Sequence, residues 1–161
     1  MKRSLTLLLA ALMVCAFFAG CAAAPAETTG AQEPAQAAPV YADQIKEGTY
    51  AIDVSSSSSM FRIVDAQLTV KGGQMSAVLT LSGTGYLKLY MGTGEEALAD
   101  TDDKCVYYVE DGEGKYTYEV PVEALNTDID CTAWSIKKEM WYDRVLVFQS
   151  ARIPEDAIIS K

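Results

Sequence analysis

The feature that most constrains the fold is a succession of short segments in which apolar and polar residues alternate. Such segments run from Thr49 to Val54, from about Arg62 to Val70 and from Met75 to Leu81, and five more follow before Gln149. Alternation with a period of two is typical of strands that are buried on one face. Turn signals, of which Gly72-Gly73 is the clearest, separate the segments at intervals of roughly 8 to 15 residues.

Strands this short need a second sheet to cover their apolar faces. The sequence therefore predicts an all-β fold, an antiparallel β-sandwich of about eight strands, with an up-and-down barrel as the alternative. Thr93-Gly94-Glu95-Glu96 fits a capping box and predicts a short helical turn over residues 95–99. Pro121 predicts that its strand ends at a sheet edge or a bulge.

The first twenty residues have the layout of a secretory signal peptide. Met1-Lys2-Arg3 is basic, and an apolar run from Leu5 to Phe18 follows it. Phe18-Ala19-Gly20-Cys21 resembles the bacterial lipobox, which implies cleavage before Cys21, diacylation of its thiol and anchoring to the extracytoplasmic face of the cell membrane. A single transmembrane anchor is the alternative, but the run is shorter than the ~20 residues that a span needs.

The chain divides into four parts on this basis. Residues 1–20 are the signal peptide, and residues 21–45 comprise the lipidated Cys21 and a flexible tether. The tether is rich in Ala, Pro, Gln and Glu and has no apolar periodicity, so it is expected to stay disordered. Residues 46–153 form the predicted β-sandwich domain, and residues 154–161 form a C-terminal tail.

Composition excludes several functions. The formal net charge is −9, which argues against nucleic acid as a partner because phosphates require a basic face. The chain contains no histidine, and so lacks the commonest general base and the commonest metal ligand. No pair of a nucleophile and a base is apparent, and we therefore expect a protein that is not an enzyme.

Two of the four cysteines remain for the domain. Cys15 would be lost with the signal peptide and Cys21 would carry lipid. Cys105 and Cys131 could pair as a disulfide in an exported domain, or remain as two reduced, buried thiols.

Several segments together resemble a NEAT (near-iron-transporter) domain. These modules bind haem, have an immunoglobulin-like fold and occur on Gram-positive surfaces. The resemblance covers residues 46–150 and is stronger as a strand layout than as any single motif. The segments that carry it are Glu47-Gly48-Thr49-Tyr50, Ser59-Met60-Phe61, 66–74, 118–122 and 141–148.

The resemblance implies a haem site. In the family, a serine-rich turn after the first strand covers the haem, and a Tyr-x-x-x-Tyr motif in the last hairpin supplies the iron ligand. Tyr142 matches the first tyrosine, whereas Leu146 replaces the second, which departs from the family pattern. The positions that match the serine-rich turn are Ser58, Ser59, Met60 and Phe61.

The leading hypothesis is a lipid-anchored module that captures haem or an iron-bearing ligand for a membrane transporter of the ABC type. Tyr142 would coordinate the iron, Trp141 would lie beside it, and Arg144 would receive an anionic group of the ligand. The alternative is a module for protein interaction or adhesion, or an accessory subunit of a membrane complex, in which Tyr107, Tyr116 and Trp134 would contact the partner.

Overall fold

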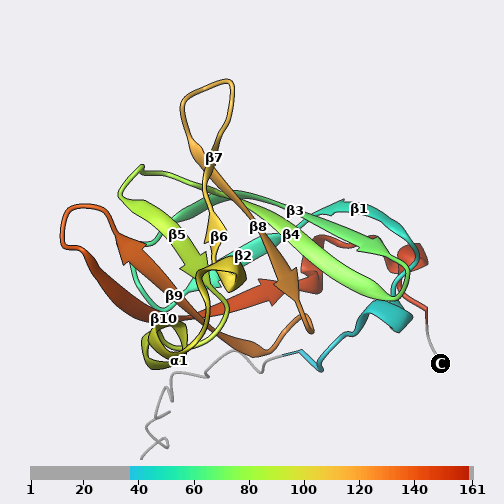
Figure 1. Cartoon of the computed structure of the whole chain (residues 1–161). Helices are drawn as coiled ribbons and strands as arrows, with labels where there is room; N and C mark the ends of the chain where they lie inside the picture. The colour runs from blue at the N-terminus through green and yellow to red at the C-terminus, as the bar shows by residue number, and fades with distance from the viewer. Residues whose placement is uncertain (1–36, 160–161) are drawn as a thin grey trace, which may run out of the picture. The chain divides into compact units, whose positions relative to one another are not determined.

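The computed structural model describes residues 37–159. The predicted signal peptide, the lipidation of Cys21 and most of the predicted tether lie outside the described residues. Two antiparallel sheets of five strands each make up the described part, which confirms the predicted all-β sandwich (Figure 1). No helix within residues 37–159 is long and apolar enough to span a bilayer.

The first sheet has the strand order β1-β3-β4-β8-β7. Its strands are β1 (Gly48–Ala51), β3 (Ile63–Lys71), β4 (Gln74–Leu81), β8 (Tyr116–Val122) and β7 (Val109–Glu110). The second sheet has the order β2-β10-β9-β5-β6. Its strands are β2 (Asp53–Ser56), β10 (Met140–Gln149), β9 (Asp128–Ser135), β5 (Tyr86–Tyr90) and β6 (Val106–Tyr107).

The strand count is ten rather than about eight because two of the predicted strands change sheet along their length. The first predicted strand divides at Ile52, so that β1 pairs with β3 while β2 pairs with β10. The predicted strand from Val106 to Glu110 divides at Tyr108 in the same way, with β6 on β5 and β7 on β8. Both divisions occur without a turn residue, so the alternation of the sequence continues across them.

Short helices complete the structure. The one α-helix within residues 37–159 is α1 (Gly94–Ala99). It begins as the sequence predicts, because the Thr93 side chain accepts from the amide of Glu96 while the Glu96 carboxylate accepts from the amide of Thr93. Four 3₁₀ turns are also present among the described residues: η1 (Ala42–Gln44), η2 (Asp102–Lys104), η3 (Ser150–Arg152) and η4 (Glu155–Ala157).

The core lies between the two sheets. It is formed by the alternate residues of each strand, as the period-two pattern predicts. One polar contact joins the sheets within it, because the Tyr118 hydroxyl on β8 donates to the carbonyl oxygen of Tyr86 on β5 at 2.8 Å. The largest fully buried side chains include Tyr118, Phe61, Phe148, Leu68, Leu79, Leu89 and Leu146.

The folded unit extends beyond the predicted limits of residues 46–153 at both ends. Val40 forms a β-bridge with Leu125, and Ile45 forms one with Ile158. Ile45 and Ala157 are buried in the core. These flanking segments are too short to show a periodicity of their own, so the sequence places them in the tether and the tail.

Candidate functional site

One end of the sandwich brings together most of the residues that the sequence singled out. We call it the hairpin end, and it consists of residues 57–62, 82–86 and 135–144. Hydrogen bonds join the three segments: the amide of Ser82 donates to the carbonyl oxygen of Arg62 at 2.9 Å, and the amide of Ile136 donates to that of Gly85 at 3.0 Å. The β9–β10 hairpin and the β4–β5 loop are seen at the same end on the left of Figure 1.

Tyr142 and Arg144 lie on the face of β10 that turns toward the other sheet. Tyr142 is opposite Ala133 and Arg144 is opposite Cys131, both of which are fully buried. Exposure falls along this face, from 39% at Tyr142 to 4% at Arg144 and zero at Leu146. Tyr142 is therefore at the opening of the sandwich, whereas Leu146 is a core residue.

The Tyr142 hydroxyl forms no hydrogen bond with any residue in the described range 37–159. Its oxygen is free to bind a ligand atom, and its exposure gives a ligand access. Leu146 gives no polar support, because its side chain is apolar and lies in the core.

Arg144 is buried behind Tyr142 and is not at the opening. Its Nε and Nη2 donate to the carbonyl oxygen of Tyr142 at 3.2 and 2.9 Å. Its Cζ lies 4.2 Å from the ring centre of Phe61 and 4.9 Å from that of Tyr86, which places the cation against two aromatic rings. Its Nη1 is buried without a hydrogen-bond partner among the described residues. As placed, Arg144 braces the backbone of Tyr142 and cannot reach a ligand at the surface.

The predicted serine-rich turn divides between surface and core. Ser59 is exposed and Met60 is 84% exposed, whereas Phe61 is only 1% exposed and packs edge-on against Tyr86 with ring centres 5.3 Å apart. The amide of Phe61 donates to the carbonyl oxygen of Ser58 at 3.1 Å and closes the turn. Ser59 and Met60 are thus at the surface of the hairpin end and Ser58 is half-buried, whereas Phe61 packs beneath the turn.

Trp141 belongs to the hairpin end, but its side chain is on the opposite face of β10 from that of Tyr142, so the two side chains do not share a site. It packs edge-on against Trp134 on β9, with ring centres 5.3 Å apart and an angle of 75° between the ring planes, and the Nζ of Lys88 lies 5.4 Å from its ring centre. Lys88 also forms an ion pair with Asp102, and that contact holds the pKa of the Asp102 carboxyl below its usual range. This outer face of the second sheet is a separate aromatic surface.

The two cysteines of the domain are free thiols and not a disulfide. Cys131 points into the core from β9, and burial raises the pKa of its thiol to about 12. Cys105 follows η2 and lies near Asp102 and Lys88, on the side of the sheet away from the core. The two side chains thus lie on opposite faces of the second sheet, which explains why they do not pair.

Sequence reasoning missed two basic residues at the hairpin end, Arg62 and Lys137. They line a small cavity of about 280 Å³ together with Met60 and Tyr86. A signal was available, because Arg62 directly follows the predicted turn and Lys137 begins a Lys-Lys pair in the β9–β10 turn. In the sequence both are indistinguishable from solvated charges.

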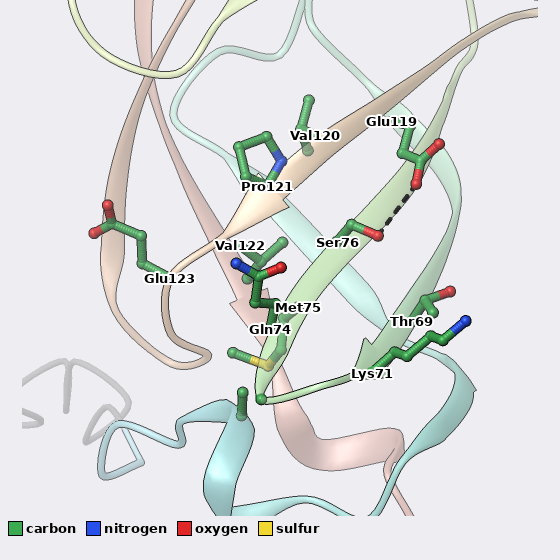
Figure 2. Close-up of a pocket in the computed structure, with 12 residues that line it drawn as sticks. Thr69, Lys71, Gln74, Met75, Ser76, Glu119, Val120, Pro121, Val122 and Glu123 are labelled. Atoms are coloured by element: carbon green, nitrogen blue, oxygen red, sulfur yellow. Dashed lines mark hydrogen bonds between the residues drawn. The ribbon is translucent and has the colours of Figure 1, made fainter.

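A larger cavity lies elsewhere, on the outer face of the first sheet. It is an open groove of about 1010 Å³ over β3, β4 and β8, and Figure 2 shows Ser76 joined to Glu119 in it, with Lys71 and Glu123 at opposite sides of the view. The groove contains none of the residues at the hairpin end.

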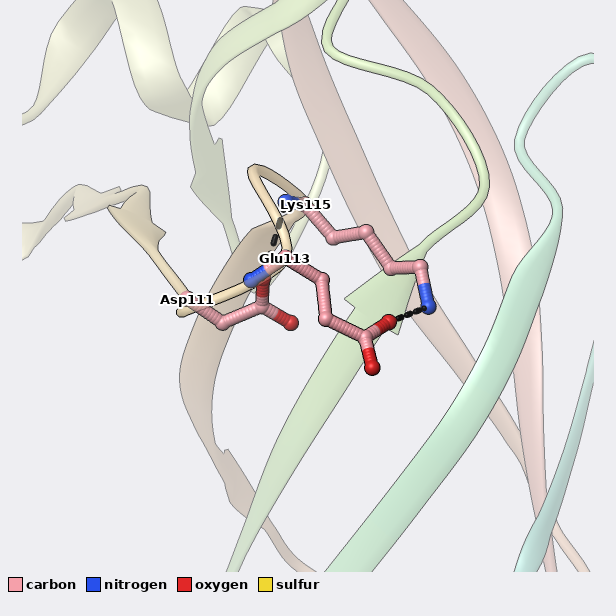
Figure 3. A network of polar contacts seen from close by, with 3 residues as sticks. All are labelled: Asp111, Glu113 and Lys115. Carbon is pink, nitrogen blue, oxygen red and sulfur yellow. Dashed lines mark hydrogen bonds and ion pairs between the residues drawn. The ribbon is translucent and has the colours of Figure 1, made fainter.

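The loop between β7 and β8 projects from the sandwich in Figure 1 and is closed by its own polar contacts. Asp111 accepts from the amides of Glu113 and Lys115, and Lys115 pairs with Glu113 (Figure 3). These contacts keep the loop folded.

No group of three or more His, Cys, Asp or Glu side chains within residues 37–159 is arranged to hold a metal ion. Comparison with protein-family models and with curated proteins finds no match for this chain.

Proposed function

We propose that the protein is a lipid-anchored binding module of the cell surface that captures haem or a related iron-bearing ligand at the hairpin end. It would pass the ligand to a membrane transporter by exchange between sites, without breaking a covalent bond. One observation supports this proposal above the others. The hydroxyl of Tyr142 is exposed at the opening of the sandwich and has no hydrogen-bond partner within residues 37–159.

The surroundings of Tyr142 suit an apolar ring system. Four large apolar side chains of the hairpin end are exposed. Exposed apolar side chains that gather at one end of a protein favour a binding surface there. The four residues are Met60, Ile136, Met140 and Tyr142.

The chemistry of the chain is consistent with a tyrosinate ligand. A chain without histidine must bind ferric haem through another side chain, and a tyrosine oxygen is an established type of axial ligand. Arg144 fixes the backbone carbonyl of Tyr142 with two hydrogen bonds, so the tyrosine is held in place without using its hydroxyl.

The test is a titration of the detergent-extracted, full-length protein with ferric haem, followed in visible light. We expect a saturable one-to-one Soret shift, and a Tyr142→Phe variant should lose at least about tenfold in affinity, which corresponds to about 1.4 kcal/mol. Tyr107→Phe is the matched control, because Tyr107 is an exposed tyrosine on the outer face of the second sheet and should bind as the wild type does. Absence of any saturable shift would refute the proposal.

A second candidate function is supported by that outer face. Tyr107, Trp134 and Trp141 lie there beside Lys88, and aromatic residues dominate the energetics of protein interfaces. In this case the domain would bind a protein. The substitution Tyr107→Phe would lower the affinity for that partner, whereas Tyr142→Phe would leave it unchanged.

A further inference from the structure

A single row of side chains crosses the outer face of the second sheet. Each member is directly opposite the next: Trp141 on β10, Trp134 on β9, Lys88 on β5 and Tyr107 on β6. Neighbouring strands lie about 4.8 Å apart, so the row extends roughly 14 Å across the four strands. Both tryptophans of the chain are in this row.

The row already holds one basic side chain within the molecule. The Nζ of Lys88 lies 5.4 Å from the ring centre of Tyr107 and 5.4 Å from that of Trp141. The same ammonium group forms an ion pair with Asp102. Aromatic faces attract cations, and a carboxylate beside them adds to that attraction. Lys88 thus shows how this face receives a basic group.

Two tyrosines of the same face each donate a hydrogen bond to a carboxylate. The Tyr107 hydroxyl donates to Asp102 at 2.7 Å, and the Tyr90 hydroxyl donates to Asp100 at 3.0 Å. Hydrogen bonds from the amide of Thr101 and from Tyr90 hold the pKa of the Asp100 carboxyl below its usual range. Both carboxylates are therefore ionised at neutral pH, and each keeps lone pairs for a further donor.

The segment from α1 to β6 borders the row with negative charge. It is fixed against the sheet, because the amide of Gly94 donates to Asp143 on β10 at 2.6 Å and Asp102 pairs with Lys88 on β5. Between Gly94 and Tyr107 it carries one basic side chain, Lys104, and five acidic ones: Glu95, Glu96, Asp100, Asp102 and Asp103.

Part of this negative charge is not neutralised within the domain. Glu95 and Asp103 are exposed, and neither takes part in an ion pair among residues 37–159. Apolar surface is exposed beside them, since Leu98 is 75% exposed and Tyr107 is 44% exposed. Aromatic and apolar surface with an acidic rim is complementary to a basic partner.

We propose that the outer face of the second sheet binds an arginine-rich segment of a partner protein. Guanidinium groups stack on the rings of the row and donate hydrogen bonds to the carboxylates of the rim. Arginine fits this face better than lysine, because its planar group stacks on an aromatic ring and matches a carboxylate with two parallel donors. The inference goes beyond ligand capture, and it gives the second candidate function a partner of stated chemistry.

The test uses three synthetic peptides of equal length, which contain six arginines, six lysines or six citrullines, the last being neutral. Each is titrated into the full-length protein in a nonionic detergent. Tryptophan fluorescence reports on this face, because Trp134 and Trp141 are the two tryptophans of the chain. We expect a saturable change with the arginine peptide, at least about threefold weaker binding of the lysine peptide, and no change with the citrulline peptide.

Two double variants of equal charge test the location. Glu95→Gln with Asp103→Asn should weaken binding of the arginine peptide at least about fivefold. Glu119→Gln with Glu123→Gln is the matched control, because it removes two exposed carboxylates from the groove on the first sheet and should bind as the wild type does. Tyr107→Leu removes a ring of the row and should weaken binding at least about threefold. Thermal unfolding of each variant checks that the fold is kept.

The inference is overturned if the arginine peptide gives no saturable change or if the lysine peptide binds as tightly. It is also overturned if both double variants lose affinity alike, since general attraction to a chain of net charge −9 would have that result. Ferric haem titrated into the same proteins tests ligand capture separately. A Soret shift without arginine binding would refute this inference alone, whereas arginine binding without a Soret shift would refute haem capture and leave this inference.

Discussion

Replacing Phe61 by alanine should severely destabilise the domain, although the sequence resemblance places this residue at a ligand surface. The Phe61 side chain is 1% exposed, and its ring contacts both Tyr86 and the guanidinium of Arg144. Truncating a buried phenylalanine costs about 3–5 kcal/mol, from lost transfer free energy and from the cavity left behind. Loss of the ring would also remove one of the two aromatic faces that stabilise the buried cation.

Met60→Ala is the matched control because it alters the neighbouring residue, which is 84% exposed. A surface substitution of this kind changes stability by within about 0.5 kcal/mol. For a domain of this size, a loss of 4 kcal/mol lowers the melting temperature by roughly 10–20 °C, whereas the control should stay within about 3 °C.

Urea and thermal unfolding followed by circular dichroism measure both variants. Phe61→Ala should lower the urea concentration at the midpoint of unfolding. It should leave unchanged the slope of the unfolding free energy against urea concentration, because a change in stability alone has that signature. A Phe61→Ala protein within about 1 kcal/mol of the wild type, or a Met60→Ala protein as unstable as Phe61→Ala, would contradict the burial of Phe61 and the brace that it forms with Arg144.

Three further predictions follow from named contacts. Arg144→Met should keep the free energy of unfolding within about 1 kcal/mol of the wild-type value, because it removes a buried charge with its unpartnered Nη1 and keeps a side chain of similar length. A loss above about 3 kcal/mol in urea unfolding would contradict this. Gly94→Ala should loosen α1 and speed its amide exchange, because the added Cβ would lie 3.0 Å from Oδ1 of Asp143 and 3.1 Å from the Cβ of Trp141; unchanged exchange would count against it. Burial raises the pKa of the Cys131 thiol to about 12 from an ordinary 9.0, so the unfolded state loses this proton at a lower pH than the folded state. The free energy of unfolding should therefore fall as the pH rises from about 9 to 12, and a Cys131→Val variant whose stability depends on pH as strongly as that of the wild type would contradict this.

The sequence predicted local structure well because its signals are local. Gly72 and Gly73 have φ values of 59° and 73°, which is the left-handed conformation that a two-residue hairpin requires. The capping box at Thr93 is present. Strand β7 pairs with β8 only at Tyr116 and Thr117, so Pro121 lies in the part of β8 whose edge on that side is unpaired. Each of these depends on residues close together in the chain.

The divisions at Ile52 and Tyr108 could not be predicted in the same way. Strand pairing joins residues far apart in the sequence, and one alternating segment can supply both sheets without a local signal. The same limit applies to the site. The period-two pattern puts Tyr142 and Arg144 on one face, but only the structure shows that the first is at the opening while the second is buried.

The N-terminal part of the account remains a prediction from sequence. The predicted secretion, lipidation at Cys21 and tether would place the domain outside the membrane, where a capture module would encounter its ligand. A flexible chain over residues 22–39, as their composition predicts, has about 18 residues and would hold the domain roughly two nanometres from the bilayer.

The most direct measurement is an amide NMR map of the labelled protein titrated with gallium protoporphyrin, a diamagnetic substitute for ferric haem. The account predicts that the shifted amides fall in residues 57–62, 82–86 and 135–144, with saturation at one equivalent. Shifts confined to the outer face around Tyr107 and Trp134, or to the groove on the first sheet, would contradict the hairpin-end site, and the absence of any shift would contradict capture of this ligand class.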